Sequence, residues 1–333
     1  MAALIPAIPV CVQPGVLVAI CVEEDTLDDV MRQAIGQLLE AGERPDVSQT
    51  RGGNIESLGA RLQLNNPRAR LSRTESRRKV PTAIAELAWY LSGSDSAAAI
   101  APWIGVYTQE AEPDGRVHGA YGPRLFGAES GAQFERVVQM LRESPGTRRA
   151  VIAIFDRNDN YGDRKENVPC TCTLQFLCRN NRLHMVTSMR SNDAVLGLPH
   201  DVFAFTMLQE VAARELDLDL GVYIHQAASF HLYDNHVSMA EAFLAEGWQA
   251  TTEMPPIPRG SQAASLGGLV AAEQQIREGV RFEMLTMPAE PYWADLVRIL
   301  AWETARKERD IAAMQAIAVT LVNDELREFA LLT

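Results

Sequence analysis

Two short apolar stretches joined by a polar turn constrain the fold of this chain more than any other sequence feature. Residues 172–178 and 183–188 have the composition and length of β-strands, and Arg179-Asn180-Asn181 between them is typical of a tight turn. Residues 202–215 follow soon after and are mostly apolar, so we expect a buried helix there. Strands with interspersed helices indicate an α+β or α/β fold.

The rest of the chain is interpreted from its apolar periodicity and from the residues that interrupt it. Apolar stripes bounded by stop signals predict helices over residues 26–41, 82–92, 133–142, 292–306 and 312–332. Residues 15–22 and 150–155 are predicted strands. Residues 46–66 are polar and contain glycine, so we expect a loop that leads into a strand, and residues 255–268 have the composition of a linker.

Length and charge bound the number of domains and the kinds of partner. The 333 residues are 47% hydrophobic, which is enough for one large domain or two modest ones. The formal net charge of -12 repels phosphate polymers, so binding of a long nucleic acid is disfavoured. A small anionic substrate remains compatible with this charge, because a local cluster of arginines can override it.

The cysteines and the N-terminus indicate the compartment. The odd number of five cysteines, without a regular framework, predicts reduced thiols and a cytoplasmic protein. Residues 2–22 are apolar, but they lack the positive start of a signal peptide and contain three prolines, so we expect no membrane span. No second ligand pair lies at a suitable distance from Cys170 and Cys172 for a metal site, and we interpret Cys172 and Cys178 as strand residues.

One region combines several motifs that carry chemistry. In chain order they are Pro169-Cys170, Gln175-Phe176, Arg190-Ser191-Asn192-Asp193, the Leu-Gly-Leu-Pro-His-Asp segment at 196–201, and His231-Leu232-Tyr233. Their order and spacing resemble the signature of thymidylate synthases and of the pyrimidine hydroxymethylases built on the same fold. The resemblance extends from about residue 26 to about residue 258 and needs no gap between Cys170 and Tyr233.

The resemblance implies a fold and an assembly. We expect an α+β, thymidylate synthase-like fold with a mixed sheet packed by helices, formed by a catalytic domain at residues 1–260. A helical C-terminal extension at residues 261–333 would take the place of the family's usual closing tail, which is not recognisable here. The family also implies a homodimer with shared active sites.

The chemistry explains why a cysteine and arginines occur together. Carbon 5 of a pyrimidine is a poor nucleophile, and addition of a thiolate to carbon 6 makes it nucleophilic, which is the role implied for Cys170. Arg190 would favour the thiolate and contact the phosphate, and Ser191 would add a hydroxyl. Arg148 and Arg149 match a pair that reaches the phosphate of the neighbouring subunit, although a solvated turn would explain the two arginines equally well if they stood alone.

Two further residues match groups that move protons in the family. Glu86 lies among apolar neighbours, where a carboxylate is costly unless it is paired or protonated, and it aligns with the glutamate that organises water. A solvent-facing acid on a buried helix is the alternative. Tyr121 matches the tyrosine that assists proton removal from carbon 5. By the same resemblance the sugar hydroxyl contacts His231 and Tyr233, the folate pterin contacts Asp193, and the nucleotide pocket includes Gln175, unless Gln175 is simply an inward-facing strand residue.

Asp201 departs from the methylating enzymes, which have asparagine at this position. Asparagine offers a donor and an acceptor, which suits uracil, whereas an ionised aspartate only accepts and suits the 4-amino group of cytosine. Asp201 would also stabilise a proton on N3, and the related deoxycytidylate hydroxymethylases resemble this sequence here. The alternative is a helix N-cap after Pro199, and the two roles are compatible.

Other departures concern the folate wall and one phosphate contact. A family tryptophan beside the folate aligns with Tyr107, and a second aromatic position with Glu110, although Trp103 is an alternative occupant of the wall. A weaker wall would admit water and give a hydroxymethyl product. The early phosphate-loop arginine aligns with Gln49, for which Arg51 is a substitute.

These observations predict an enzyme that hydroxymethylates carbon 5 of a cytidine monophosphate, CMP or dCMP, with 5,10-methylenetetrahydrofolate. The first alternative is methylation or hydroxymethylation of a uridylate. The second is a non-catalytic nucleotide-binding protein on the same fold. His231 and Tyr233 would serve a 3'-hydroxyl in ribose and deoxyribose alike, so the sugar stays open.

Overall fold

The computed structural model describes residues 19–45, 52–72, 79–129, 131–160, 167–248 and 253–331. Within these ranges six strands form one sheet in the order β1-β2-β6-β5-β4-β3. The strands are β1 (Cys21–Glu24), β2 (Asn54–Leu64), β3 (Val151–Ala153), β4 (Thr171–Arg179), β5 (Arg182–Asp193) and β6 (Asp219–Tyr233). Strands β1 and β2, and likewise β5 and β6, run parallel, whereas the other neighbours are antiparallel. The expected α+β fold with a mixed sheet is confirmed.

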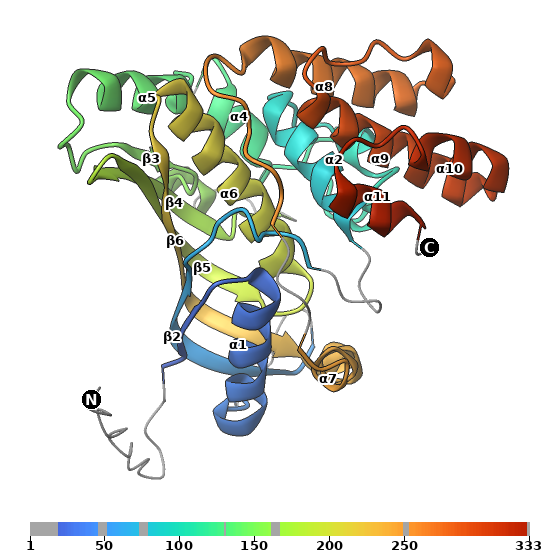
Figure 1. Cartoon of the computed structure of the whole chain (residues 1–333). Coiled ribbons are helices and arrows are strands. Elements are labelled where there is room, and N and C mark those ends of the chain that lie inside the picture. Colours follow the sequence, from blue (N-terminus) through green and yellow to red (C-terminus); the bar gives the residue numbers. More distant parts are fainter. Residues whose placement is uncertain are drawn as a thin grey trace, which may run out of the picture.

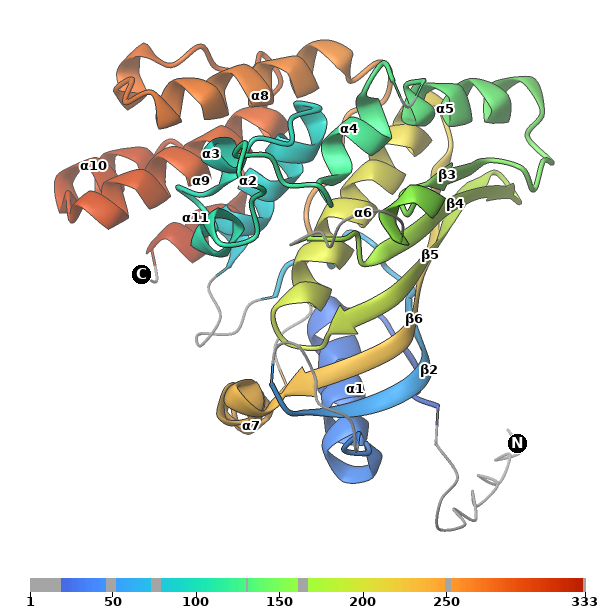
Figure 2. The same cartoon turned by 180° about the vertical axis from the view of Figure 1, so that it is seen from behind.

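Helices cover one face of this sheet and form a second group beside it. They are α1 (Leu27–Ala41), α2 (Val80–Leu91), α3 (Ala97–Ile100), α4 (Tyr121–Phe126), α5 (Gln133–Glu143), α6 (Gly197–Glu215), α7 (Val237–Ala245), α8 (Ala263–Arg277), α9 (Pro291–Glu308), α10 (Ile311–Ala318) and α11 (Asp324–Leu331). Four short 3-10 turns complete the described elements, η1 (Gly105–Thr108), η2 (Arg157–Asn160), η3 (Asp234–His236) and η4 (Phe282–Met284). Figures 1 and 2 show α1 and α6 against the sheet, while α8 and α9 pack on α2 and carry α10 and α11 on α9.

No described helix covers the opposite face of the sheet (Figure 1). A row of side chains crosses this open face in register through Gln63, Ile224, Val186, Gln175 and Val151. Val151 is 40% exposed. An apolar and amide-lined sheet face of this kind is suited to contact with another protein surface.

Helix α1 was predicted correctly because its apolar stripe and both of its ends have clear signals in the sequence. Thr26 caps α1 by accepting a hydrogen bond from Asp29 N at 3.0 Å, and the apolar stripe faces the core. The helix ends where Gly42 N donates to Leu38 O at 2.9 Å. A Cβ atom at Gly42 would overlap Leu38 O and Ile55, so glycine lets β2 approach the helix end closely.

The β4–β5 hairpin was also predicted correctly. Asn180 and Asn181 both adopt left-handed backbone angles, with φ of 51° and 58°, which asparagine tolerates better than most residues. Leu174 and Phe176 of β4 are fully buried under α5 and α6. Cys172 and Cys178 lie in β4, as expected.

Three predictions of local structure need correction. Residues 46–66 contain the eleven-residue strand β2, whose alternation is hidden because Gly59, at φ 77°, interrupts its pairing with β6. The predicted linker 255–268 instead enters helix α8 at Ala263. The predicted helix 312–332 is two helices, α10 and α11, because the Asp295 carboxylate accepts from Val322 N at 3.0 Å and from Asn323 N at 2.6 Å.

Two predictions extend beyond the described residues. The strand expected at residues 15–22 begins outside them, and β1 starts at Cys21. No helix in the described part of the chain is long and apolar enough to cross a membrane.

Candidate active site

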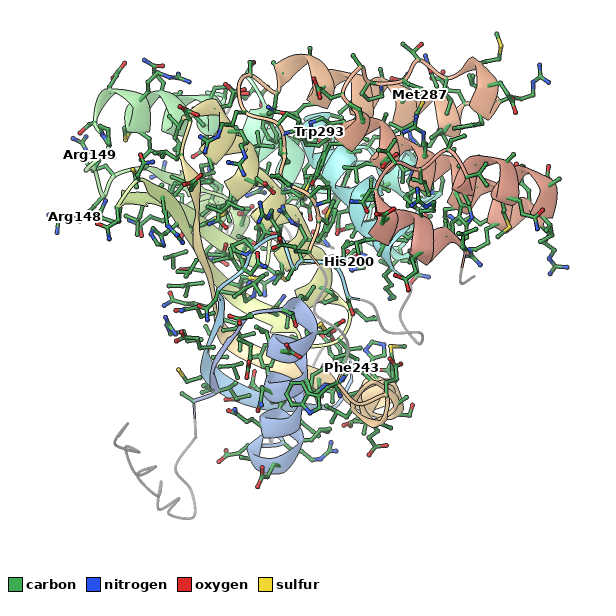
Figure 3. The ribbon with its side chains drawn as sticks, viewed as in Figure 1. Arg148, Arg149, His200, Phe243, Met287 and Trp293 are labelled. Carbon is green, nitrogen blue, oxygen red and sulfur yellow. The ribbon has the colours of Figure 1, made fainter. Side chains whose placement is uncertain are left out.

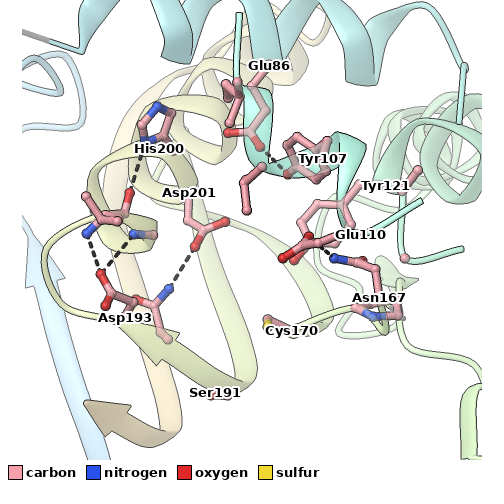
Figure 4. A pocket seen from close by; sticks show the side chains of 18 of the residues that line it. Glu86, Tyr107, Glu110, Tyr121, Asn167, Cys170, Ser191, Asp193, His200 and Asp201 are labelled. Carbon is pink, nitrogen blue, oxygen red and sulfur yellow. Dashed lines mark hydrogen bonds between the residues drawn. The ribbon is translucent and has the colours of Figure 1, made fainter. Parts of the chain in front are cut away.

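A cavity of about 530 Å³ lies between the ends of β5 and β6, the start of α6, and helices α2 and α4. Figure 4 shows Glu86, Tyr107 and Tyr121 on one side, Asp201 toward the middle, and Cys170 below them. Nine of the thirteen residues selected from the sequence line this cavity, namely Glu86, Tyr107, Tyr121, Cys170, Ser191, Asp193, Asp201, His231 and Tyr233.

Cys170 lies immediately before β4, where the chain enters the sheet from a loop. Arg190 on the neighbouring strand holds this loop. Its guanidinium donates from Nε to Pro169 O at 2.8 Å and from Nη2 to Val168 O at 2.9 Å, and Arg190 N donates to Cys170 O at 2.8 Å. Arg190 therefore fixes the backbone that carries the thiol, although its side chain does not line the cavity of the single chain.

Glu86 and Tyr107 form a hydrogen-bonded pair above the thiol. Glu86 comes from α2 and is only 6% exposed, so the solvent-facing alternative is wrong. The Tyr107 hydroxyl donates to Glu86 Oε1 at 2.6 Å, and Trp89 packs against the Tyr107 ring at 5.0 Å between centroids. Burial, and then the adjacent Glu86 charge, raise the pKa of Tyr107 well above its ordinary value, so this hydroxyl remains a donor at every physiological pH.

Trp103 does not occupy the wall, so that alternative is wrong. Its indole Nε1 donates to Glu273 Oε1 of α8 at 2.6 Å, and the Lys307 ammonium of α9 lies 5.0 Å from the ring centre. The aromatic residues of α2 and η1 that do line the cavity are Trp89, Tyr90 and Tyr107.

Tyr121 begins α4 and faces Cys170 across the cavity. Its oxygen accepts from Thr171 N at 3.1 Å and from Thr171 Oγ1 at 3.0 Å. Burial first, and then the charges of Asp201 and Cys170, raise the pKa of Tyr121 well above its ordinary value, and the two bonds from Thr171 offset part of that rise. Tyr121 therefore keeps its proton in the free protein.

Asp201 is not the helix N-cap that one alternative predicted. Helix α6 begins four residues earlier, at Gly197, and the Asp193 carboxylate bonds to the backbone that leads into it. Asp193 Oδ1 accepts from Val195 N at 2.9 Å, from Gly197 N at 3.3 Å, and from Leu196 N. The side chain of Asp201 is thus available to the cavity.

The two carboxylates have opposite pKa shifts. Burial first, and then the Glu86 charge, raise the pKa of Asp201 well above its ordinary value, although a hydrogen bond from Asn192 Nδ2 at 2.7 Å opposes the rise. For Asp193, burial also acts upward, but His236 and the backbone N–H groups outweigh it and the pKa is lowered. Asp193 is therefore ionised at neutral pH, whereas Asp201 holds a proton more readily.

The ends of β5 and β6 place three polar residues on one wall. His231 and Tyr233 lie two residues apart on β6, with ring centres 4.8 Å from each other in an edge-to-face arrangement. Ser191 on β5 pairs with Ser229 of β6, two residues before Asp193 pairs with His231. Residues at the carboxyl ends of adjacent parallel strands thus converge on the cavity.

Three predicted nucleotide contacts lie away from the cavity. Arg148 and Arg149 are exposed at the edge of the molecule, far from His200 (Figure 3). Gln175 faces the open side of the sheet and donates to Arg148 O at 2.9 Å, so neither sequence interpretation of Gln175 holds for the single chain. Among the described residues that line the cavity there is no arginine, and Lys79 is the single lysine. Gln49 and Arg51 lie outside the described residues.

Several residues that shape the cavity had no role predicted from the sequence. Asn192 and His200 stood inside quoted motifs without a role. Asn192 bonds to Asp201, and His200 lies 2.9 Å from both Leu196 O and Thr82 Oγ1. Asn167 donates to Glu110, the acid that replaces an aromatic position. These residues are recognisable only from contacts between distant segments.

The sequence of this chain is similar to those of known proteins. The model of the thymidylate synthase family matches residues 31–259. Thymidylate synthase of Francisella philomiragia subsp. philomiragia is 28% identical over 180 residues, which cover 50% of this chain and 66% of that protein. Thymidylate synthase of Francisella tularensis subsp. holarctica matches with the same identity and coverage. The match therefore spans slightly less than two thirds of these relatives.

Proposed function

Because the chain belongs to the thymidylate synthase family, we propose that it is a one-carbon transferase acting on carbon 5 of a pyrimidine nucleoside monophosphate. The observation that carries the proposal is the convergence of Cys170, Glu86 and Tyr121 on one cavity. These residues come from three separate elements, and a nucleophile, a carboxylate and a phenol around one space form a catalytic arrangement.

The residues have distinct proposed roles. Cys170 Sγ bonds to carbon 6 of the base, which makes carbon 5 nucleophilic, and the thiolate leaves again at the end. Tyr121, which holds its proton in the free site and accepts two hydrogen bonds from Thr171, orients a water molecule that takes up the carbon 5 proton. Glu86 positions the water that becomes the new hydroxyl, and His231 and Tyr233 hold the sugar.

The cavity fits the co-substrate that the family implies. 5,10-methylenetetrahydrofolate would supply the one-carbon unit. Trp89 and Tyr107 offer an aromatic wall for a flat ring, and the ionised Asp193 can accept hydrogen bonds from the amino and N–H groups of a pterin. The volume of about 530 Å³ lies within the range of small-molecule sites.

Asp201 supports a cytidylate as the substrate, with a hydroxymethyl group as the product. A carboxylate accepts from the 4-amino group of cytosine and stabilises a proton on N3. The raised pKa of Asp201 means that the carboxyl can itself supply that proton to N3. A neutral carboxyl also resembles the amide of asparagine, so the same observation favours a uridylate as the second candidate.

A second copy of the chain is proposed to complete the binding site for the phosphate of the nucleotide. The cavity of one chain lacks arginine among its described lining residues, whereas Arg148 and Arg149 are exposed beside the open sheet face. A copy packed on that face would bring these guanidinium groups toward the neighbouring site, where they suit phosphate oxygens. We therefore propose a homodimer with shared active sites.

The C-terminal helices have a proposed supporting role. Helices α8 and α9 pack against α2, which carries Glu86, and Trp103 bonds to Glu273 of α8. We propose residues 1–260 as the catalytic domain and residues 261–333 as an extension that braces α2. A cytoplasmic location also remains a proposal, supported by the odd number of cysteines.

The deciding experiment offers CMP, dCMP, UMP and dUMP together with 5,10-methylenetetrahydrofolate and identifies the products by mass. A hydroxymethylated cytidylate with tetrahydrofolate as the second product supports the proposal. A methylated product with stoichiometric dihydrofolate, seen by its absorbance, contradicts hydroxymethylation. A uracil product makes the second candidate correct, and nucleotide binding without turnover indicates a non-catalytic protein.

A further inference from the structure

A row of buried polar side chains leads from Asp201 into the core. Asn192 Nδ2 donates to Asp201 Oδ2 at 2.7 Å, and Asn192 Oδ1 lies 3.1 Å from His225 Nε2. His225 Nδ1 in turn lies 2.9 Å from the Tyr223 hydroxyl. Asn192, His225 and Tyr223 are 3%, 1% and 0% exposed. Buried polar groups are costly unless each is bonded, so this row needs an explanation beyond packing.

The protonation state of His225 is set by its position. Burial lowers the pKa of His225 to about 3, so the ring is neutral at physiological pH and carries one N–H. Two hydrogen-bond directions are then conceivable. Either Nε2 donates to the Asn192 carbonyl and Nδ1 accepts from Tyr223, or every bond in the row is reversed.

The reversed direction is unfavourable at the end that faces the cavity. It would turn the Asn192 carbonyl toward the Asp201 carboxylate, which repels unless Asp201 is protonated at Oδ2. At the other end, the hydroxyl hydrogen of the fully buried Tyr223 would lose His225 as its acceptor and would have to turn toward the buried side chain of Thr187. The direction in which Tyr223 donates to His225, and His225 to Asn192, satisfies all four groups.

This direction has a consequence for base recognition. A carboxyl group whose proton can sit on either oxygen presents donor and acceptor in either order, and so matches cytosine and uracil alike. The Asn192 amide holds Oδ2 of Asp201 as an acceptor, which leaves Oδ1 as the one oxygen that can carry or exchange a proton.

We propose that His225 is a specificity-determining positioning residue, which orients the Asn192 amide so that Asp201 presents a single donor and acceptor order to the base. The proposal rests on the proposed function for its substrate. Its structural part, the direction of the hydrogen bonds, does not depend on which nucleotide reacts.

The charges around Asp201 support this role for Asn192. Glu86 from α2 and Asp193 from β5 both raise the pKa of Asp201, and the hydrogen bond from Asn192 opposes them. The hydroxyls of Tyr90, Tyr121 and Tyr223 also experience the Asp201 charge. Removal of the Asn192 bond therefore shifts the pKa of Asp201 further upward.

The first test measures the direction in the wild-type protein. The ¹⁵N chemical shifts of the His225 ring distinguish the Nε2–H from the Nδ1–H tautomer without any nucleotide. The proposal requires Nε2–H, and a ring protonated at Nδ1 overturns it. This measurement stands even if no variant folds or no nucleotide reacts, so its failure is distinct from failure of the proposed function.

The second test compares His225→Phe with His225→Gln. Phenylalanine cannot donate to Asn192, so the pKa of Asp201, followed by its ¹³C carboxyl signal, should rise by about 1, and the ratio of kcat/KM for cytidylate over uridylate should fall about tenfold. Glutamine keeps a donor and an acceptor and should restore both values. Thr206→Val, which removes a buried hydroxyl bonded only to its own helix, controls for lost stability. A folded His225→Phe protein with both values unchanged overturns the proposal.

Discussion

The hydroxyl of Tyr107 donates a 2.6 Å hydrogen bond to Oε1 of Glu86, and so connects the aromatic wall of the cavity with the carboxylate proposed to position water. A tryptophan at this position would have a larger ring, and its N–H group would lie at a different place relative to Glu86. The tyrosine therefore combines two effects, because it leaves a smaller wall and it holds one oxygen of Glu86, which leaves the other for water.

Tyr107→Phe tests this link. The variant keeps the ring that packs on Trp89 but loses the donor to Glu86. A hydrogen bond to a charged group contributes about 1.5–3 kcal/mol, so we expect kcat for product formation to fall by about 10- to 150-fold with the fold intact. Steady-state kinetics with the preferred nucleotide gives the answer. An unchanged kcat would show that the bond plays no part in water addition.

Cys170→Ala tests the nucleophile. The sugar contacts proposed for His231 and Tyr233 lie elsewhere, so the variant should fold and bind nucleotide normally. Turnover should fall by several orders of magnitude, because no other group in the cavity can form the adduct at carbon 6. Release of the carbon 5 hydrogen into water is the measurement, and Cys172→Ala, two residues further along in β4, is the matched control. Substantial release by Cys170→Ala would remove this cysteine from the mechanism.

The sequence predicted the elements that have strong local signals and the residues that carry reactive groups. The stripe and caps of α1, the asparagine turn of the hairpin, and the cluster around Cys170 were all recognisable from neighbours in the chain. The full extent of strand β2 was not, because Gly59 breaks its alternation, and the start of α8 was not, because residues 255–268 have the composition of a linker.

The missed parts of the site share one physical cause. The bond between Tyr107 and Glu86, and the row from Asp201 to Tyr223, join segments whose proximity is determined only by the folded sheet and its helices. Each partner looks ordinary in its own segment. Asp193 was assigned to folate alone, although its carboxylate also accepts hydrogen bonds from the backbone that leads into α6, which only the backbone geometry reveals.

Mixed dimers test the shared site. If Arg148 and Arg149 contact the phosphate bound by the neighbouring chain, then Cys170→Ala and the Arg148→Ala/Arg149→Ala double variant should each be inactive. Mixed and allowed to exchange, they should regain part of the activity, because a hybrid dimer contains one intact site. Arg179→Ala, an exposed arginine at the hairpin turn, is the control and should stay active alone. A chain that is active while strictly monomeric in sedimentation contradicts the shared site.

The raised pKa of Asp201 should make the free energy of unfolding of the protein depend on pH. A folded-state pKa above the unfolded value of about 4 means that the folded chain binds this proton more tightly, so stability is lost as pH rises from about 4 through the folded pKa. Asp201→Asn removes this loss. We expect its Tm to exceed that of the wild type at pH 7 to 8 and the difference to shrink toward about pH 4. Equal Tm values across this range would contradict the shift.

The same substitution tests which base Asp201 recognises. Asp201→Asn keeps the shape of the side chain but turns one acceptor into a donor, which then faces the 4-amino group of cytosine. Such a mismatch costs about 2–4 kcal/mol, or about 30- to 1000-fold in kcat/KM. Uracil gains, because the amide donates to its carbonyl and accepts from N3. We therefore expect the variant to lose most of its activity on cytidylates and to shift toward uridylates, as measured by kcat/KM for matched pairs in both proteins. A wild type that already prefers the uracil nucleotide, or a ratio that does not move, would show that Asp201 does not select cytosine.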